Sequence, residues 1–298
     1  LRMLREIHEQ TGNWAKLVGV LEAMAGLVDD ATAASLHQER GRLLENTLQQ
    51  IDEAKAAYKA ALDLQPSALS AFAGLERLVA RSEGPEALCD LYRQRLDHSE
   101  GADRRFWLVR IARSLSAADA PNPDVVDAWQ AALDGSNEPE LRREQQHWLG
   151  ARGLWKDVAA SMQAEAEATS GPQRSHPLVA LARVREEHLS DTDGAIAAWR
   201  EALVADPSAG PARDAVVRLL GASGRHKELL DVLGSYVDTL QDPNMVVTTL
   251  YRMGELCEGT VQDQAGARAN FERILDTAPG YLPALEGLER VYTRLEAW

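Results

Sequence analysis

The segment AKAAYKAALDLQP at residues 54–66 decides the fold, because its pattern of small, aromatic, small and proline residues returns along the chain. The copy AIAAWREALVADP at residues 195–207 keeps both small residues and the proline unchanged and replaces the tyrosine with tryptophan. The aromatic residues of four such copies recur at a nearly constant interval: Tyr58, Trp129, Trp199 and Phe271. A fixed period of this length indicates a stacked array whose units bury their apolar faces against one another.

A second series has the same period and begins each time with glycine. Gly12-Asn13-Trp14 and Gly153-Leu154-Trp155 show it most clearly, Gly84-Pro85-Glu86 and Gly224-Arg225-His226 keep the glycine, and Trp298 returns at the end. The two series alternate, so each period divides into two slightly unequal half-units. Each half-unit has about the length of a helix–turn–helix repeat.

The spacing inside the quoted segment is that of an α-helix. Steps of four and three residues place Ala54, Tyr58 and Ala61 on one helical face. Pro66 is expected to end this helix and to start the next one, because proline lacks an N–H and fits a first turn. Abundant alanine and leucine, with aromatic residues at 5%, also favour helix. We predict about 17 helices, which alternate between a first (A) and a second (B) type.

One copy departs from the pattern. Asn137 replaces the closing proline of the second copy, and the stretch Ala120-Pro121-Asn122-Pro123 interrupts the sequence before it. We expect a local kink or weak packing there, because each proline removes a backbone donor.

The small–aromatic–small–proline spacing resembles the second helix of the tetratricopeptide repeat (TPR), a short helix–turn–helix unit. The resemblance implies an all-α solenoid of about eight TPR-like hairpins in one domain, 1–298. Its four double repeats are 12–83, 84–152, 153–223 and 224–295. The first helices lack the tryptophan and the Leu-Gly pair that are usual in the family. With 27 arginines against five lysines, the chain resembles the long TPR arrays of GC-rich bacteria.

The two ends of the chain match one another. Residues 1–14 align with residues 285–298 without a gap, so that Leu1, Leu4 and Ile7 correspond to Leu285, Leu288 and Val291. We interpret the chain as a window from a longer array. The apolar residues at its ends also leave end-to-end self-association open as an alternative.

The overall charge limits the class of partner. A net charge of −14 disfavours nucleic acid, because phosphate binding needs clustered basic side chains. No apolar run approaches the length of a transmembrane helix, so direct membrane insertion is not expected. No signal peptide is visible, and we place the protein in the cytoplasm. Cys89 and Cys257 stand in different repeats and are expected to be separate buried thiols.

No sequence motif indicates catalysis or a cofactor. The sequence contains no phosphate-cradling glycine loop, HExxH, CxxC or nucleophile elbow. The seven histidines are scattered without an i, i+4 pair. We therefore expect a protein that is not an enzyme and that needs neither cofactor nor metal.

The charges separate by helix type. The B helices carry most of the net negative charge, and the A helices are slightly positive. The resemblance implies that the A helices line a concave groove and the B helices its convex back. The residues that it places in the groove are Arg81, Arg105, Arg110, Arg143, His147, Arg218, Arg252 and Arg290. Guanidinium groups offer a fixed fork to carboxylates, which predicts a protein partner with an acidic segment or a free C-terminus.

Other interpretations remain open at this stage. One alternative is that the arginines pair with nearby glutamates such as Glu39, Glu76 and Glu144, and histidine is usually an ordinary surface residue. The leading hypothesis is a non-catalytic scaffold that holds a partner peptide or helix in the groove. Its alternative is a structural spacer or self-assembling segment. An RNA-reading helical repeat is disfavoured by the net charge.

Overall fold

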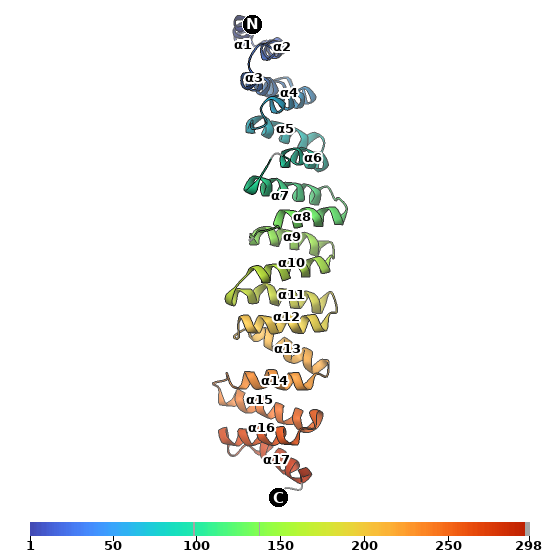
Figure 1. The fold of residues 1–298 in the computed structure, drawn as a ribbon, viewed down its shortest axis with the longest axis vertical. Coiled ribbons are helices and arrows are strands. Elements are labelled where there is room, and N and C mark those ends of the chain that lie inside the picture. Colours follow the sequence, from blue (N-terminus) through green and yellow to red (C-terminus); the bar gives the residue numbers. More distant parts are fainter. Residues whose placement is uncertain (98, 137, 296–298) are drawn as a thin grey trace. The chain divides into compact units, whose positions relative to one another are not determined.

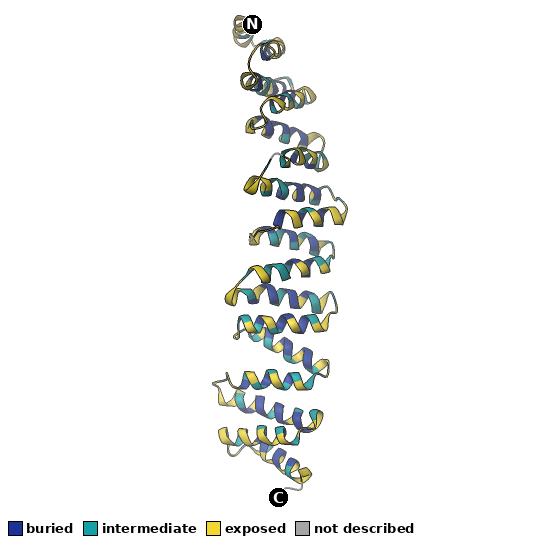
Figure 2. Ribbon diagram, in the orientation of Figure 1, coloured by how far each residue is buried: buried dark blue, intermediate teal, exposed yellow. Residues whose placement is uncertain are grey.

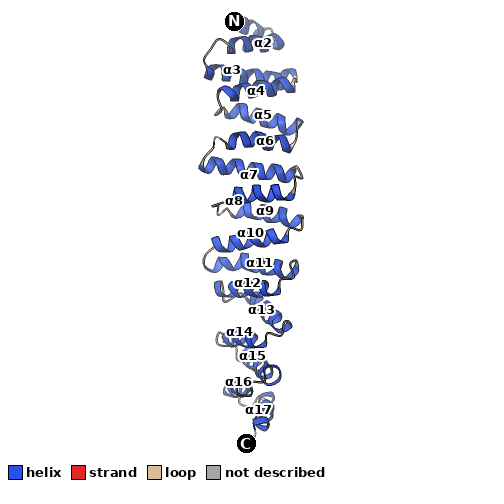
Figure 3. Ribbon diagram, turned by 45° about the vertical axis from the view of Figure 1, so that its right-hand side comes forward, coloured by secondary structure: helices blue, strands red, loops and turns tan. Residues whose placement is uncertain are grey.

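The structure is a computed structural model that describes residues 1–97, 99–136 and 138–295. In these residues it contains seventeen α-helices and no strand (Figures 1 and 3). Asn137 and Trp298, which belong to the repeat pattern, lie outside the described residues. The chain divides into two compact units, Leu1–Glu138 and Pro139–Trp298.

Helices follow one another as hairpins within each unit. The first unit holds α1 (Arg2–Gln10), α2 (Trp14–Ala25), α3 (Asp30–Leu43), α4 (Ile51–Leu64), α5 (Leu69–Ser82), α6 (Pro85–Leu96), α7 (Gly101–Ala117) and α8 (Asn122–Leu133). The second unit holds α9 (Pro139–Ala151), α10 (Trp155–Ala168), α11 (Ser175–Glu187), α12 (Thr192–Ala205), α13 (Gly210–Ala222), α14 (His226–Val237), α15 (Pro243–Glu255), α16 (Gln264–Thr277) and α17 (Leu282–Leu295). Odd-numbered helices are the A helices, and even-numbered helices are the B helices.

The predicted solenoid of helix hairpins is confirmed in each unit. Each helix packs mainly on its neighbours in sequence, as α3 does on α4 and α11 on α12. Buried and exposed residues alternate along the helices, as expected for amphipathic helices in a stack (Figure 2). The four aromatic residues of the repeat are at most 3% exposed: Tyr58, Trp129, Trp199 and Phe271. Their flanking small or β-branched residues are fully buried, including Ala54, Ala61, Ala195 and Ala202.

The glycines of the second series turn the chain from an A helix into a B helix. Gly12, Gly84, Gly153 and Gly224 have φ between 65° and 87°, a region that side chains with a Cβ rarely occupy. The other A-to-B turns use polar residues in the same left-handed region: Gln49, Asp119, Ser190 and Gln262. The two half-units of the period therefore make the same left-handed turn with different residues, glycine in one and a polar residue in the other.

Two of these turns are reached through a π-helical turn that the sequence pattern does not predict. The elements η1 (Leu44–Leu48) and η3 (Leu256–Val261) extend α3 and α15, and each ends at a left-handed glutamine. One extra residue per turn rotates the last side chains about the helix axis. Glu45 and Glu258 are thereby buried, at 5% and 8% exposure.

The role predicted for the prolines is half correct. Pro66, Pro207 and Pro279 end α4, α12 and α16, but none of them starts the following helix, which begins three residues later. The residue before each proline is extended, with φ near −135° to −140°, because the proline ring excludes the helical conformation there. The chain then closes a tight turn, as in the hydrogen bond from Ala68 N to Gln65 O of 3.0 Å.

The stretch 120–123 does not break a helix. Residues 120 and 121 lie in the turn between α7 and α8, and α8 runs from Asn122 to Leu133 with Pro123 in its first turn. Proline is tolerated there because the N–H that it lacks has no partner inside the helix. The division into two units instead falls after Glu138, within the predicted double repeat 84–152.

The aromatic ring of a B helix fits between two A helices where both have glycine. In the first unit, a Cβ added to Gly41 of α3 or Gly74 of α5 would stand 2.7 Å or 2.5 Å from the Tyr58 ring. In the second unit, Phe271 stands in the same way between Gly254 and Gly287. The glycines therefore allow the A helices to approach the ring closely.

We predict that Gly74→Ala lowers the free energy of unfolding by about 1–3 kcal/mol, because the added methyl group overpacks a rigid ring. Gly19→Ala on α2 is the matched control, since nothing lies within 4 Å of its Cβ position. This control should be neutral or should stabilise by up to about 1 kcal/mol. Urea unfolding followed by circular dichroism measures both. Equal midpoints for the two variants would contradict the close packing.

Candidate functional site

All eight predicted groove residues lie on A helices. Arg81 is on α5, Arg105 and Arg110 on α7, Arg143 and His147 on α9, Arg218 on α13, Arg252 on α15 and Arg290 on α17. They divide into a group that is bound to glutamates of the preceding A helix and a group that is exposed or weakly held.

Three of the eight are bound to glutamates of the preceding A helix. Arg110 pairs with Glu76. Arg218 stands 2.7 Å from Glu186, and Arg290 stands 3.0 Å from Glu258. Pairing with neighbouring glutamates, the alternative for the whole set, therefore holds for these three. Glu39, another of the glutamates named for this role, is bound by Arg5 of α1 at 2.9 Å.

The remaining five are exposed or weakly held. Arg81 and Arg252 make no side-chain hydrogen bond or ion pair with any residue that the structure describes. Arg143 is 3.6 Å from Glu140 of its own helix, with side-chain exposures of 69% and 87%. His147 follows Arg143 by one helical turn and is also exposed. Arg105 stands 3.8 Å from Glu138.

A buried glutamate centre joins α3, α4 and α5. The Tyr58 hydroxyl donates to Glu45 Oε2 at 2.8 Å. Arg77 of α5 donates to both carboxylate oxygens of Glu45, from Nε at 2.8 Å and Nη2 at 2.7 Å. A bidentate guanidinium and a phenol satisfy a carboxylate that water barely reaches, and such charge-assisted hydrogen bonds are the strong ones.

These contacts shift the protonation of the centre. The Arg77 hydrogen bonds hold the pKa of Glu45 below its ordinary value, against the effect of burial and with help from Tyr58. Burial raises the pKa of Tyr58, and the Glu45 carboxylate raises it further. Glu45 is therefore ionised and Tyr58 is protonated near neutral pH.

The glutamate–arginine pair of this centre recurs with the period of the repeat, without the tyrosine hydroxyl. Arg290 donates hydrogen bonds to both carboxylate oxygens of Glu258, from Nε at 3.1 Å and from Nη2 at 3.0 Å. Arg294 forms a further ion pair with Glu258 at 3.3 Å. Glu186 and Arg218 hold the equivalent positions. In the second copy Ser116 replaces the glutamate and accepts a hydrogen bond from Trp129 Nε1 at 3.1 Å.

Sequence reasoning named Glu76 but missed Glu45, Glu186 and Glu258 as partners of arginines, although a signal exists. Three of the four copies have a glutamate at one fixed distance before the aromatic residue and an arginine at another fixed distance after it. These pairs are Glu45 and Arg77, Glu186 and Arg218, and Glu258 and Arg290. The tetrapeptide Gly-Leu-Glu-Arg at 74–77 also returns at 287–290. Aligning the four copies in full would have shown that Arg218 and Arg290 belong to the repeat frame.

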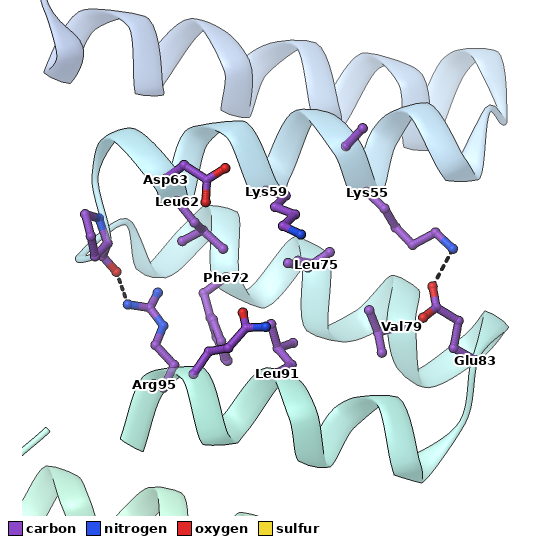
Figure 4. Close-up of a pocket in the computed structure, with 13 residues that line it drawn as sticks. Lys55, Lys59, Leu62, Asp63, Phe72, Leu75, Val79, Glu83, Leu91 and Arg95 are labelled. Atoms are coloured by element: carbon purple, nitrogen blue, oxygen red, sulfur yellow. Dashed lines mark hydrogen bonds and ion pairs between the residues drawn. The ribbon is translucent and has the colours of Figure 1, made fainter. Parts of the chain in front are cut away.

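A pocket of 560 Å³ lies elsewhere, between the B helices α4 and α6, with α5 as its floor (Figure 4). Apolar side chains of Phe72, Leu75 and Val79 form this floor. None of the eight predicted residues lines the pocket. The sequence pattern did not indicate it, because its walls come from helices that are adjacent only after folding.

The described residues show few other chemical features. No three or more His, Cys, Asp or Glu side chains among them are placed to hold a metal ion. Cys89 and Cys257 are buried and unbonded to each other. None of the described helices combines the length and the apolarity that crossing a bilayer requires.

No protein-family model and no curated protein matches the sequence. Similar solved structures include YrrB, a TPR protein with an unusual peptide-binding site. It is 18% identical over 61% of this chain and 91% of YrrB, with a TM-score of 0.34. The C-terminal part of a TPR repeat-containing protein from Cytophaga hutchinsonii is 13% identical over 95% of this chain and 98% of that one, with a TM-score of 0.38.

The TPR2AB domain of yeast Sti1, from a complex with pHSP90, is 14% identical. The match covers 88% of this chain and 97% of that domain, with a TM-score of 0.32. This chain resembles these proteins as an all-α array of TPR-like helix hairpins. With TM-scores below 0.5, no groove, residue or ligand is carried over from them.

We predict that Glu45→Gln lowers the free energy of unfolding by about 1–3 kcal/mol near neutral pH, because it removes the charge from the hydrogen bonds with Arg77 and Tyr58. Glu39→Gln, in the half-exposed pair with Arg5, is the matched control and should cost less than about 1 kcal/mol. Urea unfolding of the three proteins measures the difference.

The effect of Glu45→Gln should depend on pH in one direction. The pKa of Glu45 is lower in the folded chain than its unfolded value of about 4.3. The stabilisation is therefore complete above about pH 5.5 and is lost as the pH falls through the folded pKa. The difference between wild type and variant should shrink in acid. A constant difference down to about pH 3 would contradict the assignment.

Proposed function

We propose that this TPR-like array is a non-catalytic scaffold whose A helices hold an acidic segment or the C-terminus of a protein partner. The observation that carries the proposal is that Arg81, Arg143 and Arg252 are exposed on A helices and make no hydrogen bond or ion pair with another helix among the described residues, although Arg81 also attracts Glu45 through space. Guanidinium groups that are not neutralised offer two-pronged hydrogen bonds to carboxylates. In a chain of net charge −14, exposed cations on the A helices also select against basic ligands.

The ion pairs indicate which of the eight residues remain available to bind a ligand. Arg110, Arg218 and Arg290 are engaged by glutamates, so their role in the proposal is to join A helices. Arg81, Arg143 and Arg252 remain to meet the ligand, and His147 stands one turn from Arg143 on the same face of α9. Arg105 is the intermediate case because its contact with Glu138 is long.

The test uses a fluorescein-labelled peptide rich in glutamate and glycine, without apolar side chains, with either a free or an amidated C-terminus. We expect fluorescence anisotropy to show binding that weakens as ionic strength rises from about 0.05 M to about 0.5 M. The double variant Arg143→Gln, Arg252→Gln should weaken binding at least about fivefold. A further loss on amidation would identify the C-terminal carboxylate as part of the ligand.

The matched control is Lys16→Gln, Lys156→Gln, which removes two exposed positive charges from the B helices α2 and α10. If peptide affinity falls equally in both double variants, the loss comes from the change in net charge alone. That result would overturn the assignment of the binding site to the A helices.

A second candidate function, self-assembly, is favoured by the apolar surface of α1 and α17. Met3 and Ile7 of α1 are 74% and 45% exposed, and Leu282 and Leu285 of α17 are 62% and 43% exposed. Apolar faces of this kind mark contact surfaces when they are contiguous.

If the array assembles end to end, sedimentation velocity should show larger species as the protein concentration rises. Met3→Ser combined with Ile7→Ser should suppress them, because it removes apolar surface from one end. Val204→Ser is the control, since Val204 is 84% exposed on α12, away from both ends. A strict monomer at high concentration would exclude this candidate.

A further inference from the structure

The pocket between α4 and α6 combines an apolar interior with a charged rim. Phe72, Leu75 and Val79 of α5 are buried at its floor, and Leu62 and Leu91 are half-buried on its walls (Figure 4). A volume of 560 Å³ is large enough for one or two large side chains. An apolar floor below polar side chains is typical of sites that bind an apolar anchor and fix its orientation by polar contacts.

One cation of the rim has no carboxylate partner. Arg95 of α6 donates from Nη1 to the carbonyl oxygen of Pro66, and its guanidinium lies 4.7 Å from the centre of the Phe72 ring. The buried Nη2 has no acceptor. Burial lowers the pKa of Arg95, which means that its charge is held in a poorly solvated place. A carboxylate nearby would stabilise this charge more strongly than in water.

Of the other cations at the rim, Lys55 is held by ion pairs and Lys59 is not. Lys55 is bound by Glu83 at 2.6 Å and by Asp52 at 2.9 Å, so it is already neutralised. Lys59 is exposed and makes no ion pair with any described residue. Asp63 is the remaining anion at the rim, one turn along α4. Counted with Asp52, the rim holds three cations and three carboxylates, and its two cations without an ion pair are Lys59 and Arg95.

These residues are not part of the repeat frame. One period further along the chain, the positions equivalent to Lys59, Phe72 and Arg95 hold Gln130, Arg143 and Ala164, and the third copy has Arg200 in place of Lys59. Helix stacking in the second copy proceeds without the same cation or aromatic at these places. Phe72 also serves the stacking, since its ring lies against Tyr92 and Trp107, so the residues that point to a ligand here are Lys59 and Arg95.

We propose that the α4–α6 pocket binds a peptide segment of a protein partner in which a large apolar side chain stands close to a carboxylate. The apolar side chain enters over Phe72 and Leu75, and the carboxylate meets Lys59 and Arg95. This site belongs to the B helices and does not depend on the arginines proposed above for the A helices. Within this rim, Lys59 and Arg95 are the cations that have no ion pair and can meet a carboxylate of the segment.

The test uses a fluorescein-labelled peptide that alternates leucine with glutamate. One matched peptide carries glutamine for every glutamate, and a second carries serine for every leucine. We expect the first to bind and each of the others to bind at least about tenfold more weakly, because the pocket needs both features. Absence of binding by the first peptide would overturn the proposal, as would equal binding of all three.

The variant Ala56→Trp fills the pocket from an exposed position on its wall and leaves the core intact. It should abolish binding, whereas Ala15→Trp, at an exposed alanine of α2, should not. Lys59→Gln should weaken binding about three- to tenfold, with Lys16→Gln as the control of equal charge. Arg95→Gln should also weaken peptide binding about three- to tenfold. A thermal unfolding curve of this variant shows whether it stays folded.

The double variant Arg143→Gln, Arg252→Gln separates this site from the proposed function. If it leaves the leucine–glutamate peptide bound and Ala56→Trp removes it, the pocket is the site, whatever the A helices do. If Ala56→Trp has no effect, the pocket proposal fails even where the A-helix proposal holds.

Discussion

The fit of one aromatic ring between two A helices is the constraint on which the rest of the structure depends. Tyr58 touches α3 and α5 where each has glycine, and Phe271 does the same with Gly254 and Gly287. At the third copy the equivalent positions are alanines, Ala182 and Ala215, and both are buried. Close packing of this kind tolerates little change in volume. It therefore fixes the separation of successive A helices, and with it the rise from one hairpin to the next.

That separation makes the buried glutamate centres possible. Glu45 and Arg77 are far apart in sequence, yet their hydrogen bonds are 2.7 Å and 2.8 Å long, because α3 and α5 flank the same ring. A buried carboxylate is costly unless its hydrogen bonds are satisfied, so the arrangement is sensitive to helix register. Arginine therefore has two roles on the A helices. Some guanidinium groups join neighbouring hairpins, and others remain available to a ligand.

Charge and shape together favour two distinct kinds of ligand contact. The exposed arginines of the A helices offer charge without a cavity, which suits an extended acidic segment. The α4–α6 pocket offers a cavity with two unmatched cations, which suits an apolar anchor beside a carboxylate. Surfaces of both kinds are compatible with a scaffold, because a stacked array exposes much surface for each residue that it buries.

The sequence by itself determined the all-α repeat, the number of helices and the burial of Tyr58, Trp129, Trp199 and Phe271, because helix periodicity and a fixed repeat are local signals. It placed the eight groove candidates on A helices for the same reason. Only the tertiary structure decided that Arg218 and Arg290 are bound to glutamates while Arg81 and Arg252 are not. The burial of Glu45 in a π-helical turn and the pocket beside Arg95 are likewise visible only in the tertiary structure. These features depend on contacts between helices that are distant in sequence, which a one-dimensional pattern does not contain.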